Sequence, residues 1–291
     1  MIYLDHNAST AVRPEVVEAV REALADLPAN PSSAHPDGRR ARAAVERARE
    51  QVAGLVHVHA DEVVFTSGGT EGDHAGLIGA AWALEARGRA VAISAIEHHA
   101  VHGAAAVLAR AGFGVAHVPV GADGRVPPRA VEALPAGTTV LAVMLANNET
   151  GVLQPVAELA RRARARGVLL LCDAVQAAGK VPVDVRDLDV DLLTLSAHKL
   201  YGPKGVGCLY VRRGTRMAPL VRGGGPERNR RAGTENVAGL VGFGVAATLA
   251  RQGLEAERAR LAALRDRLEA RLLAIPGALR NGGEPRLPNT A

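Results

Sequence analysis

Short apolar runs alternate with segments of helical periodicity along most of this chain, and that alternation limits the fold more than any other feature. The runs are apolar at successive positions, so they predict strands buried on both faces of a sheet. Buried strands separated by helices are typical of an α/β protein with a mostly parallel sheet flanked by helices. The predicted strands span residues 63–66, 90–94, 114–119, 140–145, 168–172, 192–196 and 207–211.

Helical periodicity lies between many of these runs, at 71–87, 101–111, 128–134 and 155–166. The last two strands are joined by the tight turn 201–205, which predicts that this pair is antiparallel. A long helical pattern over 236–274, with a break expected near Gly253, leaves the main sheet, and 281–288 forms a loop. We expect an N-terminal arm over 1–14, a large domain over 15–252 and the start of a second domain over 253–291.

Composition excludes several classes of protein. The hydrophobic fraction of 48% and charged fraction of 22% are ordinary for a globular protein. No run approaches the roughly 18 apolar residues of a membrane span, and the N-terminus lacks the features of a secretory signal. We therefore expect a cytoplasmic protein without a membrane partner. The net charge is +5, but arginines interleave with glutamates and aromatic residues are only 2%, which argues against nucleic-acid binding. Two cysteines, Cys172 and Cys208, exclude a disulfide framework and a thiolate zinc site.

Ligands of open α/β sheets bind beyond the carboxyl ends of the strands, so residues that follow the apolar runs are the candidates for function. After the first run, Ser67, Gly68, Gly69 and Thr70 lead directly into a helix. Glycines permit close approach of a ligand to the backbone, and the helix N-terminus offers free N–H groups to a phosphate. An ordinary strand-to-helix turn has the same pattern, and the P-loop ending is missing.

Asp173 closes the fifth apolar run, where a buried carboxylate needs a cation or a hydrogen-bond donor; the alternative is a helix N-cap. Lys199 is one of only three lysines and follows the sixth run. A desolvated lysine has a lowered pKa and forms Schiff bases with carbonyl groups, whereas a lysine in a surface turn does neither. Ser196 and His198 flank it and are candidate phosphate donors.

His98 follows the second run and stands four residues before His102. No further ligand at matching spacing completes a metal site, so we expect no metal. A histidine stacked on a planar cofactor or a helix cap fits His98 better. Asn147 and Asn148 follow the fourth run and offer amide donors and acceptors, or form a turn. Phosphate, ring nitrogen, ring hydroxyl and aldehyde contacts together describe one ligand, pyridoxal phosphate.

At this level of detail the chain resembles the cysteine desulfurases of the class V aminotransferase group, which are pyridoxal-phosphate enzymes of fold type I. The S-x-H-K and R-x-G-T-E-N elements resemble desulfurases more than the sibling aminotransferases. The matching stretches follow the order of that family along nearly the whole chain: 3–10, 30–35, 66–71, 97–98, 147–151, Asp173 with Gln176, 196–199 with the 201–205 turn, and 231–236.

The resemblance implies roles around the cofactor ring. Lys199 would hold the cofactor as a Schiff base and move the α-proton of the substrate. Asp173 would pair with the pyridinium nitrogen. His98 would stack on the ring and assist proton transfer. Gln176 and Asn148 would contact the ring hydroxyl or the substrate.

The resemblance also implies the phosphate contacts. Thr70, Ser196 and His198 would bind the phosphate, with the backbone of Gly69 assisting them. Thr234 would reach the phosphate in a second subunit, which implies a homodimer. Residues 15–252 would then be the cofactor-binding domain.

The implied reaction converts L-cysteine to L-alanine and leaves the sulfur on an enzyme cysteine as a persulfide. The sulfur would serve iron–sulfur cluster or other sulfur-containing cofactor synthesis, through a sulfur-acceptor or scaffold protein. The family's sulfur-accepting cysteine and carboxylate-binding arginine lie in a C-terminal small domain, and we expect that domain to be incomplete in these 291 residues. Val175, Ala197 and His74 also depart from the family pattern. The alternatives are a cofactor-binding short form without desulfurase activity and another class V aminotransferase or lyase activity.

Overall fold

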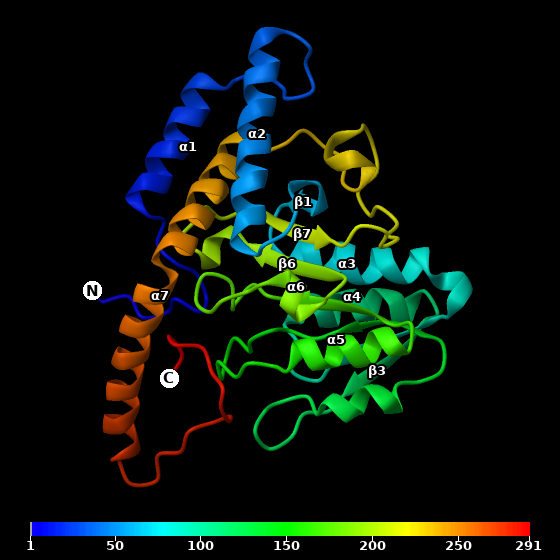
Figure 1. Ribbon diagram of the computed structural model, residues 1–291, viewed down its shortest axis with the longest axis vertical. Coiled ribbons are helices and arrows are strands. Elements are labelled where there is room, and N and C mark those ends of the chain that lie inside the picture. The colour runs from blue at the N-terminus through cyan, green and yellow to red at the C-terminus, as the bar shows by residue number, and fades with distance from the viewer. Residues whose placement is uncertain (1) are drawn as a thin grey trace.

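The computed structural model describes residues 2–291, so Met1, the first residue of the predicted arm, lies outside it. The chain forms a 7-stranded sheet in the order β1-β7-β6-β5-β4-β2-β3 with helices on both faces (Figure 1). All of the predicted strands are present, and the predicted α/β class is confirmed. The strands are β1 (Val63–Thr66), β2 (Ala90–Ser94), β3 (Gly114–Val118), β4 (Thr138–Ala142), β5 (Leu169–Asp173), β6 (Leu192–Ser196) and β7 (Gly207–Val211).

The sheet is mostly parallel. Strands β3, β2, β4, β5 and β6 pair in parallel, whereas β7 is antiparallel to both β6 and β1, as the short turn before β7 predicts for its pairing with β6. Gly207 is paired with Thr66 on one side and with Ser196 on the other. The carboxyl ends of β1 and β6 therefore lie at the same edge of the sheet as those of the parallel strands.

Two apolar cores lie on the two faces of the sheet. Helices α3 (Gly69–Ala83) and α4 (His99–Arg110) cover one face, and α5 (Val156–Ala165) and the short α6 (Val185–Leu188) lie on the other. The predicted α-helix at 128–134 is instead a 3-10 helix over Pro128–Ala133, because a short segment that starts with consecutive prolines forms a tight turn more readily than an α-helix. The helix predicted at 71–87 ends at Ala83, and a separate 3-10 turn follows over Glu85–Arg87.

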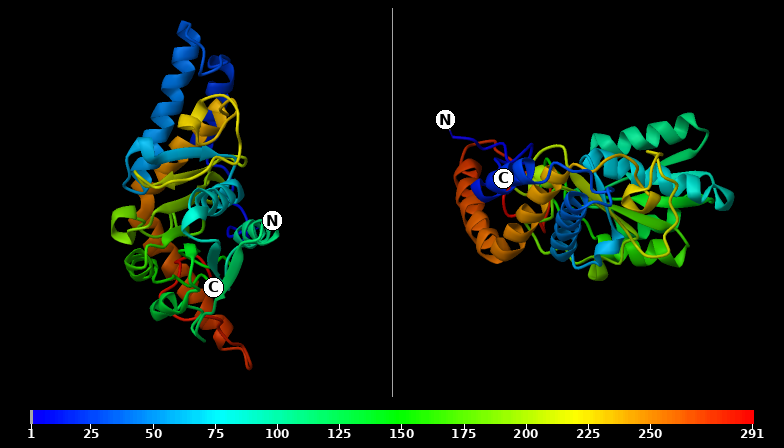
Figure 2. Two further views of the ribbon diagram at one scale, coloured as in Figure 1. Left: turned by 90° about the vertical axis from the view of Figure 1, so that its right-hand side faces the viewer. Right: turned by 90° about the horizontal axis from the view of Figure 1, so that it is seen from above.

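Three helices pack together at one end of the molecule: α1 (Pro14–Asp26), α2 (Pro36–Leu55) and the first part of α7 (Val237–Leu273). The second part of α7 extends past the sheet (Figures 1 and 2). The break expected near Gly253 is wrong, because α7 is continuous there. A single glycine inside a helix weakens it by about 1 kcal/mol without ending it. Helices α1 and α2 are not predicted from the sequence, and alanine is the commonest residue on the buried face of α2.

Helix α7 corrects one expectation drawn from composition. Among residues 2–291 it is the helix long and apolar enough to cross a membrane, with a window of mean hydropathy 1.3. Half of that window is buried inside the protein. The helix contacts α1 and α2, and the core helix of a globular protein passes the same test.

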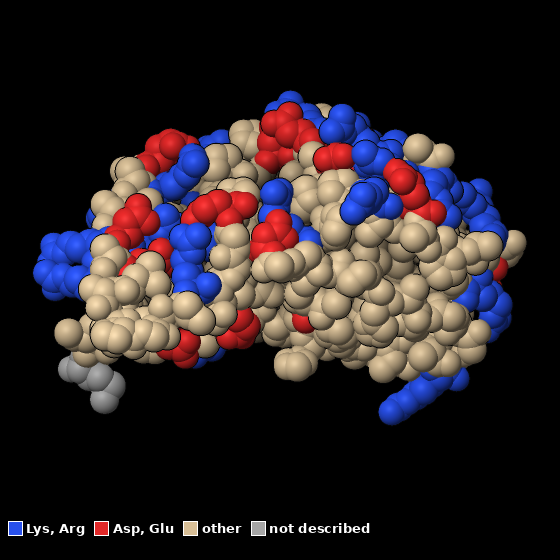
Figure 3. Space-filling model, turned by 90° about the horizontal axis from the view of Figure 1, so that it is seen from below, with Lys and Arg blue, Asp and Glu red and all other residues tan. Residues whose placement is uncertain are grey.

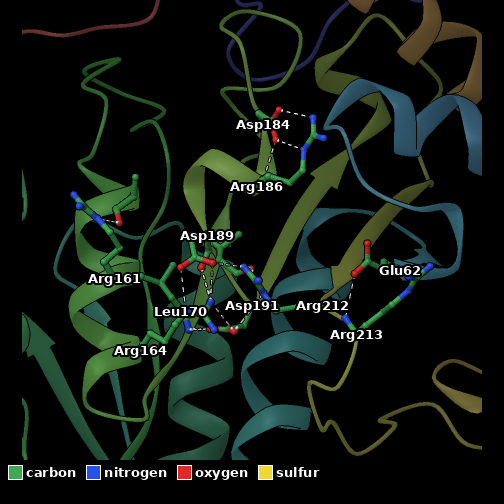
Figure 4. A network of polar contacts seen from close by, with 12 residues as sticks. Glu62, Arg161, Arg164, Leu170, Asp184, Arg186, Asp189, Asp191, Arg212 and Arg213 are labelled. Atoms are coloured by element: carbon green, nitrogen blue, oxygen red, sulfur yellow. Dashed lines mark hydrogen bonds and ion pairs between the residues drawn. The ribbon is translucent and has the colours of Figure 1, made fainter.

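Charged residues at the amino-terminal edge of the sheet are paired with one another (Figure 4). Arg164 Nε donates to Asp189 Oδ2 at 3.0 Å, and Arg212 Nη2 donates to Asp189 Oδ1 at 2.7 Å. Asp191 Oδ2 accepts from the Leu170 backbone N–H at 2.9 Å. These contacts join the starts of β5 and β6 to the end of β7, so this edge is held by structural ion pairs. On the face drawn in Figure 3, basic and acidic side chains stand side by side over one end.

Candidate active site

The turn between β1 and α3 has the geometry of an anion site. Gly68 is the N-cap of α3 and offers no side-chain cap, so the first N–H groups of the helix are free for a ligand. A Cβ at Gly69 would lie 2.9 Å from Val175 Cγ2, and a Cβ at Gly207 would lie 2.7 Å from Gly68 Cα. Close packing thus brings the ends of β5 and β7 against this turn, while Thr70 stays exposed.

Asp173 lies at the end of β5 and is buried, with one oxygen accepting from the Val175 backbone N–H at 2.9 Å. Burial raises the pKa of the Asp173 carboxyl group, and the nearby His98 and Lys199 lower it in part. A cation placed at this carboxylate would remove the cost of its burial. The predicted N-cap does not occur, because no helix begins after Asp173. The position suits a protonated ring nitrogen.

Lys199 is half-buried in the turn after β6 and reaches the N-terminal arm. Its Nζ donates to the backbone carbonyls of Asn7 and Ala8, the latter at 2.9 Å. Burial lowers the pKa of the Lys199 amine, while Asp173 and Asp5 raise it in part. Of the two interpretations drawn from the sequence, the structure agrees with a desolvated lysine and not with a solvated surface turn.

Ser196 and His198 flank this lysine, and the structure holds them differently. Ser196 is buried at the end of β6, and its Oγ lies 4.0 Å from the position of a Cβ built on Gly68. The ring of His198 contacts Ser9 Oγ through Nδ1 at 3.2 Å, on the arm. Burial and the neighbouring lysines lower the pKa of His198 to about 4, so its ring is neutral and can donate one hydrogen bond.

His98 caps α4, with Nδ1 accepting from the Ala100 backbone N–H at 3.1 Å, and its ring is exposed. The capping interpretation of His98 therefore holds, and an exposed ring beside Asp173 is free to stack on a cofactor as well. Asn148 is partly exposed, and its amide donates to Glu149 at 2.6 Å. Neighbouring Asn147 is buried and closes the turn through its Oδ1, as the turn interpretation predicts.

Asn7 is the residue that connects these segments, and sequence reasoning assigned it no role. Its backbone carbonyl accepts from Lys199 and, at 2.8 Å, from Gln176 Nε2. Its side-chain amide donates to the Asn148 carbonyl at 3.2 Å and to Thr290 Oγ1 at 3.0 Å. The arm, the turn after β6, the loop after β4 and the C-terminal segment thus meet at one asparagine. Its place in the stretch 3–10 is the only sequence signal for it.

Two further buried carboxyl groups, Asp73 and Glu97, lie near Asp173, and sequence reasoning did not predict their involvement. Glu97 is bonded through Oε1 to the Ser94 hydroxyl and the Met144 N–H, whereas its Oε2 has no partner among the described residues. Burial raises the pKa of Glu97 to about 8 and raises that of Asp73 well above its usual value. Burial thus disfavours the charged form of both carboxyl groups, and the nearby Asp173 adds to this effect for each of them.

A cavity of about 700 Å³ opens on the arm side of Lys199. The arm, the middle of α7 and the C-terminal segment line it, together with Lys180, Lys199 and Asn148. It has room for a small amino-acid ligand beside the Lys199 amine. The cavity meets the predicted cofactor contacts only at Lys199 and Asn148, so Asp173 and His98 lie on another side of the lysine.

Thr234 is exposed on the loop between β7 and α7, without a hydrogen bond within the described chain. Arg231 in this loop donates through Nε to Glu71 Oε1 at 2.8 Å, and Glu71 Oε2 accepts from the Ser67 N–H at 2.8 Å. Glu227 in the same loop is bonded to buried Arg49. The loop is therefore tied to the turn before α3, and Thr234 is left free to face outward.

Both cysteines are buried and free: Cys172 lies in β5 and Cys208 in β7. Burial raises the pKa of both thiols, so neither forms a thiolate readily. This placement confirms the interpretation of both residues as buried apolar side chains.

The family profile described as "Aminotransferase class-V" matches residues 2–290 of the chain. The "Cysteine desulfurase IscS" of Dictyoglomus turgidum is 46% identical over 266 residues, which cover 91% of this chain and 68% of that protein. The chain belongs to the cysteine desulfurase group of the class V aminotransferases. The "Cysteine desulfurase NifS" of Azotobacter vinelandii is 45% identical and is covered to 73% of its length. This chain therefore spans roughly seven-tenths of the length of these relatives.

Solved structures agree with this assignment. A structure titled "NIFS-LIKE PROTEIN" superimposes with a TM-score of 0.95 at 38% identity, over 99% of this chain and 80% of that one. A structure titled "SspA in complex with cysteine" superimposes with a TM-score of 0.82 at 35% identity, over 85% of this chain and 72% of that one. The fold is thus that of the NifS-like, fold type I enzymes, which confirms the fold expected from the sequence.

The residues present fit pyridoxal phosphate, the cofactor of this family. The uncapped start of α3 suits the phosphate. So does Gly69 at this start, where a Cβ would come too close to Val175. The buried carboxylate of Asp173 suits the ring nitrogen, and the desolvated Lys199 amine suits the aldehyde. When bound, the cofactor acts as an electron sink for negative charge developing at the substrate Cα.

Proposed function

We propose that this chain binds pyridoxal phosphate at Lys199 and removes sulfur from L-cysteine, leaving L-alanine. The observation that carries the proposal is the position of the Lys199 amine: desolvated, beside buried Asp173, and at the sheet edge that holds the uncapped start of α3. The sequence similarity to desulfurases over 91% of the chain and a similar structure titled as a cysteine complex support the substrate.

Each residue has a task that its surroundings permit. Lys199 would hold the cofactor through its aldehyde and, when its amine is free, would move a proton at the substrate Cα. Asp173 holds the proton of the ring nitrogen. His98 covers the ring and assists proton transfer at the substrate. Gln176 and Asn148 present amide groups to the ring hydroxyl or the substrate, while Gly69, Thr70, Ser196 and His198 hold the phosphate.

The sulfur step needs an accessible thiol. The carbon–sulfur bond of the substrate breaks, its Cβ gains a proton, and the sulfur forms a sulfur–sulfur bond with an attacking thiol. The products are alanine and a persulfide, so atoms and electrons balance without another oxidant. Cys172 and Cys208 are buried and protonated, so we propose that the accepting thiol is neither of them.

We further propose that the protein acts as a homodimer, because Thr234 is exposed on a loop tied to the phosphate turn, where a second copy would meet it. Iron–sulfur cluster or other cofactor synthesis, by way of an acceptor or scaffold protein, is the proposed use of the sulfur. A cytoplasmic location belongs to the proposal, because persulfide chemistry needs reduced thiols and both cysteines here are free.

The test is incubation of the purified, cofactor-loaded protein with isotope-labelled L-cysteine and dithiothreitol as sulfur acceptor. We expect labelled alanine and sulfide in equal amounts, and neither from a Lys199→Ala variant. Pyruvate as the product would show lyase chemistry, and transfer of the amino group to an added 2-oxo acid would show an aminotransferase; either outcome overturns the desulfurase proposal. Cofactor binding without any product would identify a binding protein.

A further inference from the structure

Lys180 is a buried lysine that none of the steps above uses. It follows the segment after β5, is only 8% exposed, and lies at the wall of the cavity beside Lys199. Its Nζ donates to Gln176 Oε1 at 2.8 Å, which is its one hydrogen bond within residues 2–291. A lysine is almost never buried unless its ammonium group is paired. The neutral Gln176 amide therefore stands where a buried ammonium would ordinarily require a stronger partner.

The bond to Lys180 determines which way the Gln176 amide faces. An amide has one oxygen that accepts and one nitrogen that donates, and an ammonium group can only donate. With Oε1 held by Lys180, Nε2 is directed to the opposite side, where it donates to the Asn7 carbonyl at 2.8 Å. The same carbonyl accepts from Lys199. A chain of hydrogen bonds thus runs from Lys180 through the Gln176 amide to the Asn7 carbonyl oxygen, which is also the acceptor for the reactive Lys199 amine.

We propose that Lys180 is a positioning residue, which holds the Gln176 oxygen so that the amide nitrogen faces the Asn7 carbonyl and offers its second N–H to the ring hydroxyl of the cofactor. The proposal rests on the proposed function, since it gives a purpose to the orientation of Gln176. Without Lys180, the Asn7 carbonyl alone holds the amide in this orientation, so the flipped form, which presents the amide oxygen to the cofactor, becomes more populated. A deprotonated ring oxygen can only accept hydrogen bonds, so the flipped amide weakens binding.

Burial of the charged Lys180 amine next to Lys199 is unfavourable, and a lowered pKa of this amine reflects it. Burial and the charge of Lys199 lower the pKa of Lys180 to about 7. A methionine at position 180 would pack better than the lysine in purely apolar terms. The orientation of Gln176 gives this lysine a role that offsets the unfavourable burial of its charge.

The experiment is a double-mutant cycle with Lys180→Met, Gln176→Ala and the double variant. The measured quantities are the dissociation constant of pyridoxal phosphate, the absorption maximum of the bound cofactor, and the midpoint of thermal unfolding. We expect Lys180→Met to weaken cofactor binding by about tenfold and to shift the absorption maximum, without a matching loss of thermal stability. In the Gln176→Ala background, the same change should have less than a twofold effect, because its target is gone.

Two outcomes would overturn the proposal: an unchanged dissociation constant and spectrum in Lys180→Met, or equal effects of that change with and without Gln176. If Lys180→Met does not fold, the Gln176→Leu variant is compared with the Gln176→Leu/Lys180→Met double variant. A tenfold difference between their dissociation constants for pyridoxal phosphate contradicts the proposal. Failure of the parent protein to bind the cofactor or to form alanine would instead refute the proposed function, so the two failures are distinguishable.

Discussion

The buried ion pair between Arg49 in α2 and Glu227 in the loop before α7 gives the sharpest prediction for stability. The side chains of Arg49 and Glu227 are 2% and 3% exposed. Arg49 donates to both carboxylate oxygens of Glu227, at 2.6 and 2.7 Å, and the Phe65 backbone N–H donates to Oε2 at 2.8 Å. Glu227 also begins a run of three non-glycine residues with positive φ, at 50°, 55° and 62°. The pair thus holds a strained loop against β1.

Replacement Glu227→Ala removes the buried counter-charge of Arg49 and leaves its guanidinium group with the Val63 carbonyl, the ring of Phe65 and the partly exposed carboxylate of Glu46. Loss of one partner from a buried pair lowers the free energy of unfolding by about 3–5 kcal/mol. For a chain of this size, each kcal/mol corresponds to about 2 °C, so the midpoint of thermal unfolding should fall by about 6–10 °C. Circular dichroism measures the free energy of unfolding in a urea titration and the midpoint in a thermal scan. Because the same loop carries Thr234, cofactor affinity should fall as well.

Two control variants separate the causes. Glu18→Ala removes an exposed helix-surface pair with Arg21 and should leave unfolding unchanged. The double change Arg49→Met and Glu227→Leu removes both charges and should recover most of the loss. A free energy of unfolding for Glu227→Ala within about 1 kcal/mol of the parent protein would refute the reasoning, because it would mean that the buried charge finds another partner.

Three further predictions concern the site itself. Asp173→Asn should reduce cysteine turnover by about 10- to 150-fold, the worth of one charge-assisted hydrogen bond; steady-state kinetics with unchanged kcat/KM would contradict it. Burial raises the pKa of Glu97 from 4.5 to about 8, so the unfolded chain loses this proton first and stability falls as pH rises between those values. Glu97→Gln should remove this dependence of stability on pH, whose slope is at most about 1.4 kcal/mol per pH unit. The assignment would be disproved if the urea midpoint changed equally in both proteins between pH 5 and pH 8. Replacement of Cys172 and Cys208 together by alanine should leave dithiothreitol-supported turnover within twofold, and its loss in a folded variant would identify one of them as the acceptor.

The sheet could be predicted closely because its strands are continuous apolar runs, and the bounds of each predicted strand lie within three residues of the observed ones. The helices at the end of the molecule could not be predicted as readily. The buried positions of α2 recur at helical spacing, but alanine, the commonest residue among them, is only weakly apolar and makes that pattern faint. The break expected at Gly253 is absent: this glycine lines the open cavity, where no neighbouring atom lies within 4 Å of the position of its Cβ, so no close packing forces the helix to bend there. The division of the chain at residue 253 stays a prediction.

The proximity of Asp173, Ser196 and Lys199 could be predicted because all three lie at or just after a strand end, and the topology alone brings these strand ends together. Asn7 could not be predicted in this way. Its contacts depend on the arm crossing from the far end of the chain to Asn148 and Thr290, 141 and 283 residues away. Glu97 and Asp73 escaped notice for a different reason, since their importance comes from burial beside Asp173, which sequence spacing does not reveal.

The central claim is that Lys199, among the three lysines of the chain, carries the cofactor. Reduction of the cofactor-loaded protein with borohydride, followed by proteolysis and mass spectrometry, tests it directly. The expected result is a single modified peptide with the pyridoxyl group on Lys199, and no modification in Lys199→Ala. Modification of Lys180 or Lys204 instead, or an unmodified Lys199 in protein that has bound the cofactor, would contradict the account.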